Sequence, residues 1–265
     1  EGRSTVYIGA GLTDIPDAPD SKTNYKTDWT YFEAENLFGI LRHEQNLTDN
    51  WLGYAAVGGN QTSEMGAYSS PTLNSTDGSA TISRLDVAYE AQSITGQVGL
   101  EGQFTTGDML HQVNVGYSGF AREYGSNYAW NTATNPSTNI YDPVDLAHLE
   151  ADGGSVGNPD LDTKTRAHGL ALSDSIDAFD GLINATLGLR YQQIKTSDST
   201  SEYDGDALSP VVGVSYHPTD AWTVYGNYVE ALQEGETAPS GADNAGDNIG
   251  LKRSRQFEVG AKVEG

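Results

Sequence analysis

The stretch GLINATLGLRYQQI, residues 181–194, alternates apolar and polar side chains along most of its length. The apolar positions are Ile183, Ala185, Leu187, Leu189 and Tyr191, and the residues between them are polar or glycine. Successive side chains of a β-strand point to opposite sides of the sheet, so this pattern predicts a strand with one apolar face. The two sides could face a core and water, or lipid and a wet lumen.

Other segments repeat this alternation, and no long helical pattern competes with them. The clearest are HQVNVGYSGF (111–120), ALSPVVGVSY (207–216), AWTVYGNYVEAL (221–232) and RQFEVGAKVE (255–264). We therefore predict an all-β, antiparallel protein of about ten strands. The expected strands cover residues 3–9, 29–47, 51–62, 80–105, 109–124, 163–176, 181–196, 207–217, 221–232 and 252–264.

The connections between these strands are expected to be short at one end of the strands and long at the other. Short turns are expected at 47–51, 105–108, 177–180 and 217–220, where Asp, Asn, Gly and Pro favour turns. Longer polar segments are expected at 10–28, 62–80, 125–162, 197–206 and 233–251. Short turns at one end and long loops at the other are typical of outer-membrane barrels. The polar faces hold Asn, Gln, Ser, Thr and Gly with little Lys or Glu, which favours a wet lumen inside and lipid outside.

Composition limits the classes of partner. The chain has 14 basic and 37 acidic residues and a formal net charge of -23, which argues against binding nucleic acid. The acidity could be simple solvation, or could attract cations to the loops. No apolar run approaches the roughly 18 residues that a membrane helix needs. Tyr is more frequent than Phe and Trp together, with 15 Tyr, 6 Phe and 4 Trp, as suits an interface between apolar and wet zones.

Four segments together resemble TonB-dependent outer-membrane receptors of the ferric-siderophore type. They are DIPDAPDSKTNY (14–25), FTTGDMLHQVNVGYSGF (104–120), YDPV (141–144), and YGNYVEALQEGETAP (225–239) followed by KRSRQFEVGAK (252–262). The resemblance runs through nearly the whole chain and corresponds to the central part of the family's barrel. It implies a Gram-negative outer-membrane location, a multi-pass barrel in contact with outer-membrane lipid, and uptake of an iron–siderophore complex energised through TonB.

The family pattern is larger than this chain. Family members carry a plug domain, an energy-coupling box and a barrel of 22 strands; the sequence shows no plug and no box. Residues 1–265 are therefore expected to form a single barrel segment of a 22-stranded barrel, with the plug and the other strands outside the chain. A self-contained small barrel is the alternative. A passive porin-like channel and a soluble calcium-binding β adhesin are the alternative functions.

The candidate ligand-binding residues are four aromatics that flank the long segment 125–162: Tyr124, Tyr128, Trp130 and Tyr141. The resemblance supports a role in gripping a ligand, while packing within the loop or an interfacial aromatic girdle is at least as good an explanation. Arg190 and Lys262 are expected to face the lumen. No cofactor is implied, and no nucleophile elbow, phosphate loop or paired-carboxylate arrangement predicts an enzyme.

Metal binding is not predicted, although the loops are rich in acids. The segment 125–162 contains no Lys or Arg and holds Asp142, Asp145, Glu150, Asp152, Asp160 and Asp162; Asp198, Glu202, Asp204 and Asp206 follow later. Their spacing is not that of a calcium loop. The five His residues lack metal-ligand spacing, and His111 and His217, beside short turns, are expected to be structural.

Overall fold

The computed structural model describes residues 5–199, 201–233, 235, 238–239, 241–245 and 249–264. Its regular structure consists of strands, and this part of the chain has no helix of the length and apolar character needed to cross a membrane. Residues 3 and 4 of the first expected strand, and parts of the segment 233–251, lie outside the described residues.

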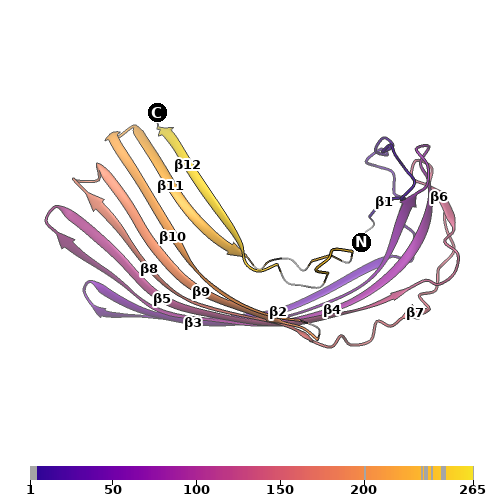
Figure 1. Cartoon of the computed structure of the whole chain (residues 1–265), viewed down its shortest axis with the longest axis horizontal. Helices are drawn as coiled ribbons and strands as arrows, with labels where there is room; N and C mark the ends of the chain where they lie inside the picture. The colour runs from indigo at the N-terminus through magenta and orange to yellow at the C-terminus, as the bar shows by residue number, and fades with distance from the viewer. Residues whose placement is uncertain are drawn as a thin grey trace. The chain divides into compact units, whose positions relative to one another are not determined.

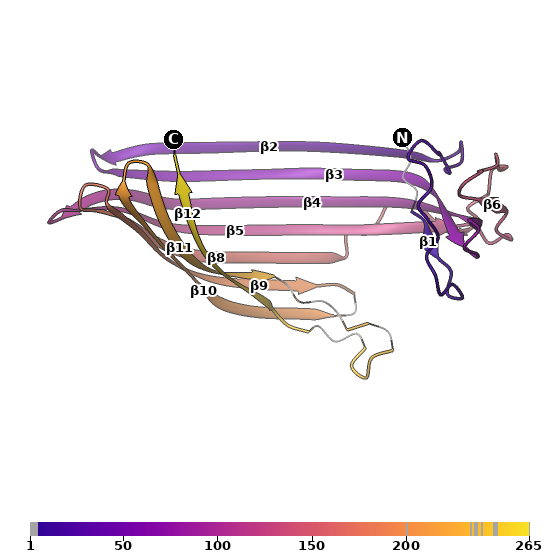
Figure 2. The same ribbon diagram turned by 90° about the horizontal axis from the view of Figure 1, so that it is seen from above.

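The strands form one twelve-stranded sheet, in which most pairs of neighbours are antiparallel (Figure 1). Their bounds are β1 Tyr7–Ile8, β2 Tyr31–Thr48, β3 Trp51–Leu73, β4 Ser79–Thr106, β5 Met109–Trp130, β6 Ser137–Asn139, β7 Gly153–Gly154, β8 Thr163–Ala178, β9 Ile183–Ser197, β10 Glu202–Thr219, β11 Trp222–Gln233 and β12 Lys252–Val263. Strands β8 to β12 follow one another in sequence order, and Figure 2 shows β2 to β5 lying side by side. The short β1 pairs with β3 in parallel.

The all-β prediction is confirmed, and each of the ten expected strands overlaps a strand of the structure, although the sheet formed by the described residues has twelve strands. The two additional strands, β6 and β7, are short and lie inside the segment 125–162. The long polar segment expected at 62–80 is wrong: β3 continues to Leu73 and β4 begins at Ser79. The segment expected at 197–206 is likewise shorter, since β9 ends at Ser197 and β10 begins at Glu202.

The long strands pass through two compact units. Unit 1 comprises residues 1–37, 61–92 and 124–161, and unit 2 comprises residues 38–60, 93–123 and 162–265. In unit 1 one side of the sheet is covered: Leu73, Ala80 and Ile140 form a buried cluster against which Val6 and Leu12 pack. In unit 2 the strands β8, β9 and β10 pair in an uninterrupted antiparallel register, with Leu189 of β9 between Leu172 of β8 and Pro210 of β10.

Candidate functional site

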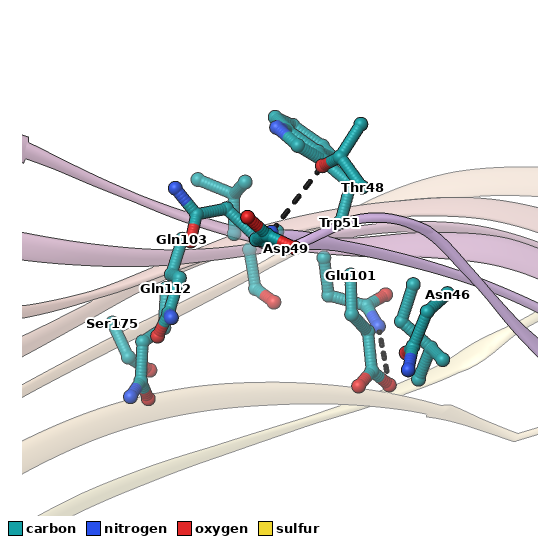
Figure 3. Close-up of a pocket in the computed structure, with 14 residues that line it drawn as sticks. Asn46, Thr48, Asp49, Trp51, Glu101, Gln103, Gln112 and Ser175 are labelled. Carbon is teal, nitrogen blue, oxygen red and sulfur yellow. Dashed lines mark hydrogen bonds between the residues drawn. The ribbon is translucent and has the colours of Figure 1, made fainter.

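Unit 2 carries polar side chains on one side of its sheet. A cavity of about 490 Å³ on this side lies close to the short turns of β2–β3 and β4–β5 (Figure 3). Its polar residues include Asn46, Glu101, Gln103, Gln112, Asn114, Ser173 and Ser175. The Asn114 side chain donates to Glu101 Oε1 at 3.2 Å. Amides, hydroxyls and the carboxylates of Asp49 and Glu101 thus form a hydrophilic wall.

The other side of unit 2 is largely apolar and exposed. In Figure 3 the Trp51 ring points away from Glu101, Gln112 and Ser175, and it lies against Gly102. Phe104 stacks on His111, with ring centroids 4.8 Å apart and planes inclined by 7°. His111 Nδ1 in turn lies 2.8 Å from Asp174 Oδ2. This contact joins β5 to β8, so the structure gives His111 the structural role that the sequence predicted.

Arg190 and Lys262 project from the polar side of unit 2. The Arg190 guanidinium donates to Ser118 Oγ at 3.2 Å. The Lys262 ammonium lies 5.4 Å from the centre of the Tyr225 ring, whose hydroxyl donates to Glu258. Both cations therefore contribute to the hydrophilic wall.

Unit 1 has an open side rich in tyrosine. On β5 the buried Gly125 and Ala129 alternate with Tyr124 and Tyr128, so these tyrosines take the opposite, open side. The ring of Tyr89 from β4 lies next to Tyr124, with centroids 6.1 Å apart.

A fourth tyrosine joins this side from β3. Tyr68 lies between the buried Ala67 and Ser69, and its hydroxyl donates to Glu64 Oε1 at 2.9 Å. Gly66 gives the Tyr68 ring its space, because a Cβ at residue 66 would lie 2.8 Å from the Tyr68 hydroxyl oxygen. We call the set Tyr68, Tyr89, Tyr124 and Tyr128 the tyrosine face.

The structure separates the four aromatic residues that the sequence singled out. Tyr124 and Tyr128 belong to the tyrosine face, and Trp130 lies on the same side of β5 with its ring against Gly153 and Gly154. Tyr141 lies elsewhere, since its hydroxyl donates to the Asp17 carbonyl oxygen at 2.7 Å. Sequence reasoning missed Tyr68 and Tyr89. Tyr68 lies in the segment 62–80, which the sequence predicts to be a loop, so no strand pattern placed its side chain on a face of the sheet.

The long segment between β5 and β8 packs on the covered side of unit 1, opposite the tyrosine face. Its residues 137–139 pair with β4 as β6, and the backbone amide of Ile82 donates to the Pro136 carbonyl oxygen. Further along, Asn127 of β5 donates to the carbonyl oxygens of Gly157 and Asn158 at 2.9 and 3.2 Å. These contacts fix the segment to the side of the sheet opposite the tyrosine face.

Acidic residues of this segment make loop contacts. Asp152 accepts hydrogen bonds from the hydroxyl and the backbone amide of Thr132, both at 2.8 Å. These hydrogen bonds hold the pKa of the Asp152 carboxyl below its ordinary value. Within the described part of the chain, no group of three His, Asp or Glu side chains is arranged to hold a metal ion.

The chain matches one family along almost its whole length. The family described as TonB dependent receptor-like, beta-barrel, matches residues 2–265. A relative described as ferrichrome receptor FcuA, from Yersinia enterocolitica, is 36% identical over 275 residues, covering 99% of this chain and 36% of the relative. The catecholate siderophore receptor Fiu of Escherichia coli K12 is 25% identical over 311 residues, covering 98% of this chain and 40% of the relative.

A solved structure shares the fold. The ferric preacinetobactin receptor BauA from Acinetobacter baumannii superposes with a TM-score of 0.81 at 24% identity, covering 98% of this chain and 39% of that protein. The chain therefore spans well under half the length of the relatives that it matches.

Proposed function

Since the chain belongs to the TonB-dependent receptor-like β-barrel family, we propose that its full-length protein takes up a ferric siderophore across the outer membrane of a Gram-negative bacterium. The named relatives are transport receptors, not enzymes. The 36% identity to a ferrichrome receptor over 99% of this chain is the observation that carries the proposal. The comparisons lend no support to the porin-like channel or to the calcium-binding adhesin.

In this proposal the apolar side of unit 2 faces lipid and the polar side faces the lumen. Leu170, Leu172 and Leu189 are 54%, 54% and 45% exposed, and they neighbour other exposed aliphatic side chains. A contiguous exposed apolar surface is unusual for a protein surrounded by water. Lipid would solvate this surface, and the hydrophilic wall would line an aqueous interior, as in other barrels of this kind.

Residues 1–265 would then form one barrel domain together with strands from other parts of the protein, to a total of 22 strands. Outer-membrane lipid would contact the apolar side. A plug domain and the TonB energy-coupling system would be the protein's partners, and neither would be supplied by this chain. No cofactor is part of the proposal, because the ferric chelate is the cargo.

The tyrosine face is the proposed ligand-contacting surface, with Trp130 at its margin. It combines broad rings with hydroxyl groups and carries the carboxylate of Glu64, to which Tyr68 donates. Such a surface suits a neutral or cationic chelate better than a strongly anionic one, because Coulomb repulsion opposes the approach of anions. With a formal charge of -23 on the chain and a ferrichrome receptor among its relatives, a hydroxamate-type chelate is the favoured ligand. Tyr141 contacts Asp17 instead and is not expected to touch the ligand.

We predict that Tyr124→Ala in the full-length receptor weakens binding of a ferric hydroxamate by roughly 5–30-fold. Removing one aromatic contact typically costs about 1–2 kcal/mol. Titration of the purified protein by intrinsic fluorescence or calorimetry would measure the change. Tyr216→Ala is the matched control, because Tyr216 is an exposed tyrosine of unit 2 and is not part of the tyrosine face. Unchanged affinity in Tyr124→Ala, with weaker binding in Tyr216→Ala, would place the ligand elsewhere.

A further inference from the structure

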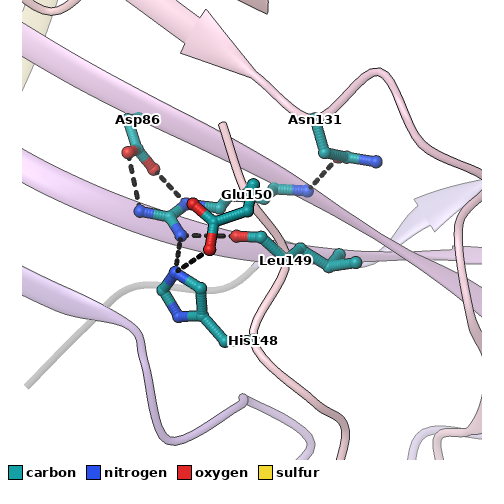
Figure 4. Close-up of polar contacts among 6 residues, drawn as sticks. Asp86, Asn131, His148, Leu149 and Glu150 are labelled. Atoms are coloured by element: carbon teal, nitrogen blue, oxygen red, sulfur yellow. Dashed lines mark hydrogen bonds and ion pairs between the residues drawn. The ribbon is translucent and has the colours of Figure 1, made fainter. Parts of the chain in front are cut away.

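Arg84, on the covered side of unit 1, holds the long segment between β5 and β8 against β4 through Leu149 and His148, which are labelled in Figure 4. The Arg84 guanidinium donates to the two carboxylate oxygens of Asp86 at 2.7 and 2.8 Å. Its Nη1 donates to the carbonyl oxygen of Leu149 at 2.5 Å and lies 2.7 Å from His148 Nε2. The side chains of Arg84 and Asp86 are each only 11% exposed.

Two further residues complete this cluster. The Arg84 guanidinium carbon lies 5.1 Å from the centre of the Trp29 ring, and His148 meets the same ring edge-on, with centroids 6.0 Å apart. The Asn131 side-chain oxygen accepts from the Arg84 backbone amide at 2.7 Å. The cluster therefore joins the residues just before β2, the strand β4 and two points of the long segment.

The contact between Arg84 and His148 requires a neutral imidazole. A guanidinium has only donors, so His148 Nε2 has to accept, and the imidazole proton has to be on Nδ1. A protonated imidazole has donors at both nitrogens and a positive charge. Arg84 remains a cation, since its hydrogen bonds to Asp86 raise the pKa of its guanidinium further. Protonation would therefore turn the 2.7 Å hydrogen bond into a contact between two cations.

We propose that His148 is an acid-sensitive latch that releases residues 147–150 from β4 when the pH falls below the range in which histidine is neutral.

Two carboxylates lie near the latch and set how strongly Arg84 repels a protonated His148. Asp86 already accepts both of its hydrogen bonds from Arg84. Glu150 Oε1 lies 3.8 Å from His148 Nε2, and the Glu150 side chain is 84% exposed, so water screens its attraction. Glu150 and, from β2, Tyr31 also interact electrostatically with Arg84. The attachments through β6 and Asp152 use no histidine, so release should be local to the latch.

A spin label on Ala147→Cys in the full-length receptor, with any other cysteines replaced, would test the latch. Ala147 is exposed and adjacent to His148, and this chain has no cysteine of its own. We expect an immobilised label at about pH 7.5 and a growing mobile fraction towards about pH 5, with the open-to-closed ratio rising by up to about tenfold per pH unit for one proton.

The decisive variant is His148→Gln, because a glutamine oxygen still accepts from Arg84 but does not titrate. In this variant the label should stay immobilised at both pH values. His168→Gln, which alters a histidine of unit 2, should keep the wild-type transition. A pH-dependent release that persists in His148→Gln, or a wild-type label that is equally immobile at both pH values, would overturn the proposal.

Discussion

Leu189→Arg is expected to destabilise the full-length barrel by about 2–4 kcal/mol, the cost of an arginine on the lipid face near the bilayer midplane. Leu189 lies on β9 between Leu172 and Pro210, so a guanidinium there would lie directly opposite apolar residues in both adjacent strands. Leu187 on the same face is a weaker test, because its partner on β8 is Asp174, which could pair with an introduced arginine. Urea unfolding in lipid vesicles would measure the loss of stability.

Thr186→Arg is the matched control, three residues away on the same strand. Thr186 lies on the polar side between Ser175 and Gly213, so an arginine there could extend into water and should change the free energy of unfolding by less than about 1 kcal/mol. Equal losses at positions 186 and 189 would contradict the assignment of lipid to the apolar side.

A second prediction with a large expected effect concerns the side of the outer membrane on which each connection lies. The short turns should lie in the periplasm and the long segment between β5 and β8 outside the cell, as in other outer-membrane barrels. Ser137 and Thr219 are both exposed, so accessibility within the protein does not distinguish them. On intact cells an impermeant maleimide should label Ser137→Cys almost completely and leave Thr219→Cys unlabelled, with equal labelling of both after the outer membrane is opened. Labelling of Thr219→Cys alone would reverse the orientation.

Much of the strand arrangement could be predicted, because apolar and polar residues alternate along a strand when the two sides of its sheet face different environments. The segment 181–194 corresponds closely to β9 (183–197), and the expected turn 177–180 overlaps the turn at 179–182. This turn depends on Phe179 and Asp180, both with φ near +55° to +57°, followed by Gly181 at +83°. Asp and Gly tolerate this region, and the turn residues were the usable signal.

The prediction failed where one side of the sheet is covered by loops instead of facing lipid. In β3 the residues Gly66, Ser69 and Pro71 are buried, and small or polar residues at buried positions hide the alternation. The same failure left Tyr68 in an expected loop and so concealed part of the tyrosine face. The pairing of β6 with β4 spans more than fifty residues of chain and depends on long-range contacts that local pattern cannot report.

Uptake of a ferric siderophore by the full-length receptor is the most direct measure of the proposed function. Cells lacking their own siderophore receptors should accumulate radioactive iron from a ferric hydroxamate when the full-length gene is expressed, and should stop when the energy-coupling system is deleted. Ferric tricatecholate, which is highly anionic, should be transported less well at low salt. Uptake of neither chelate would contradict the proposed function, and faster uptake of the tricatecholate, slowed by added salt, would show that the binding surface is basic.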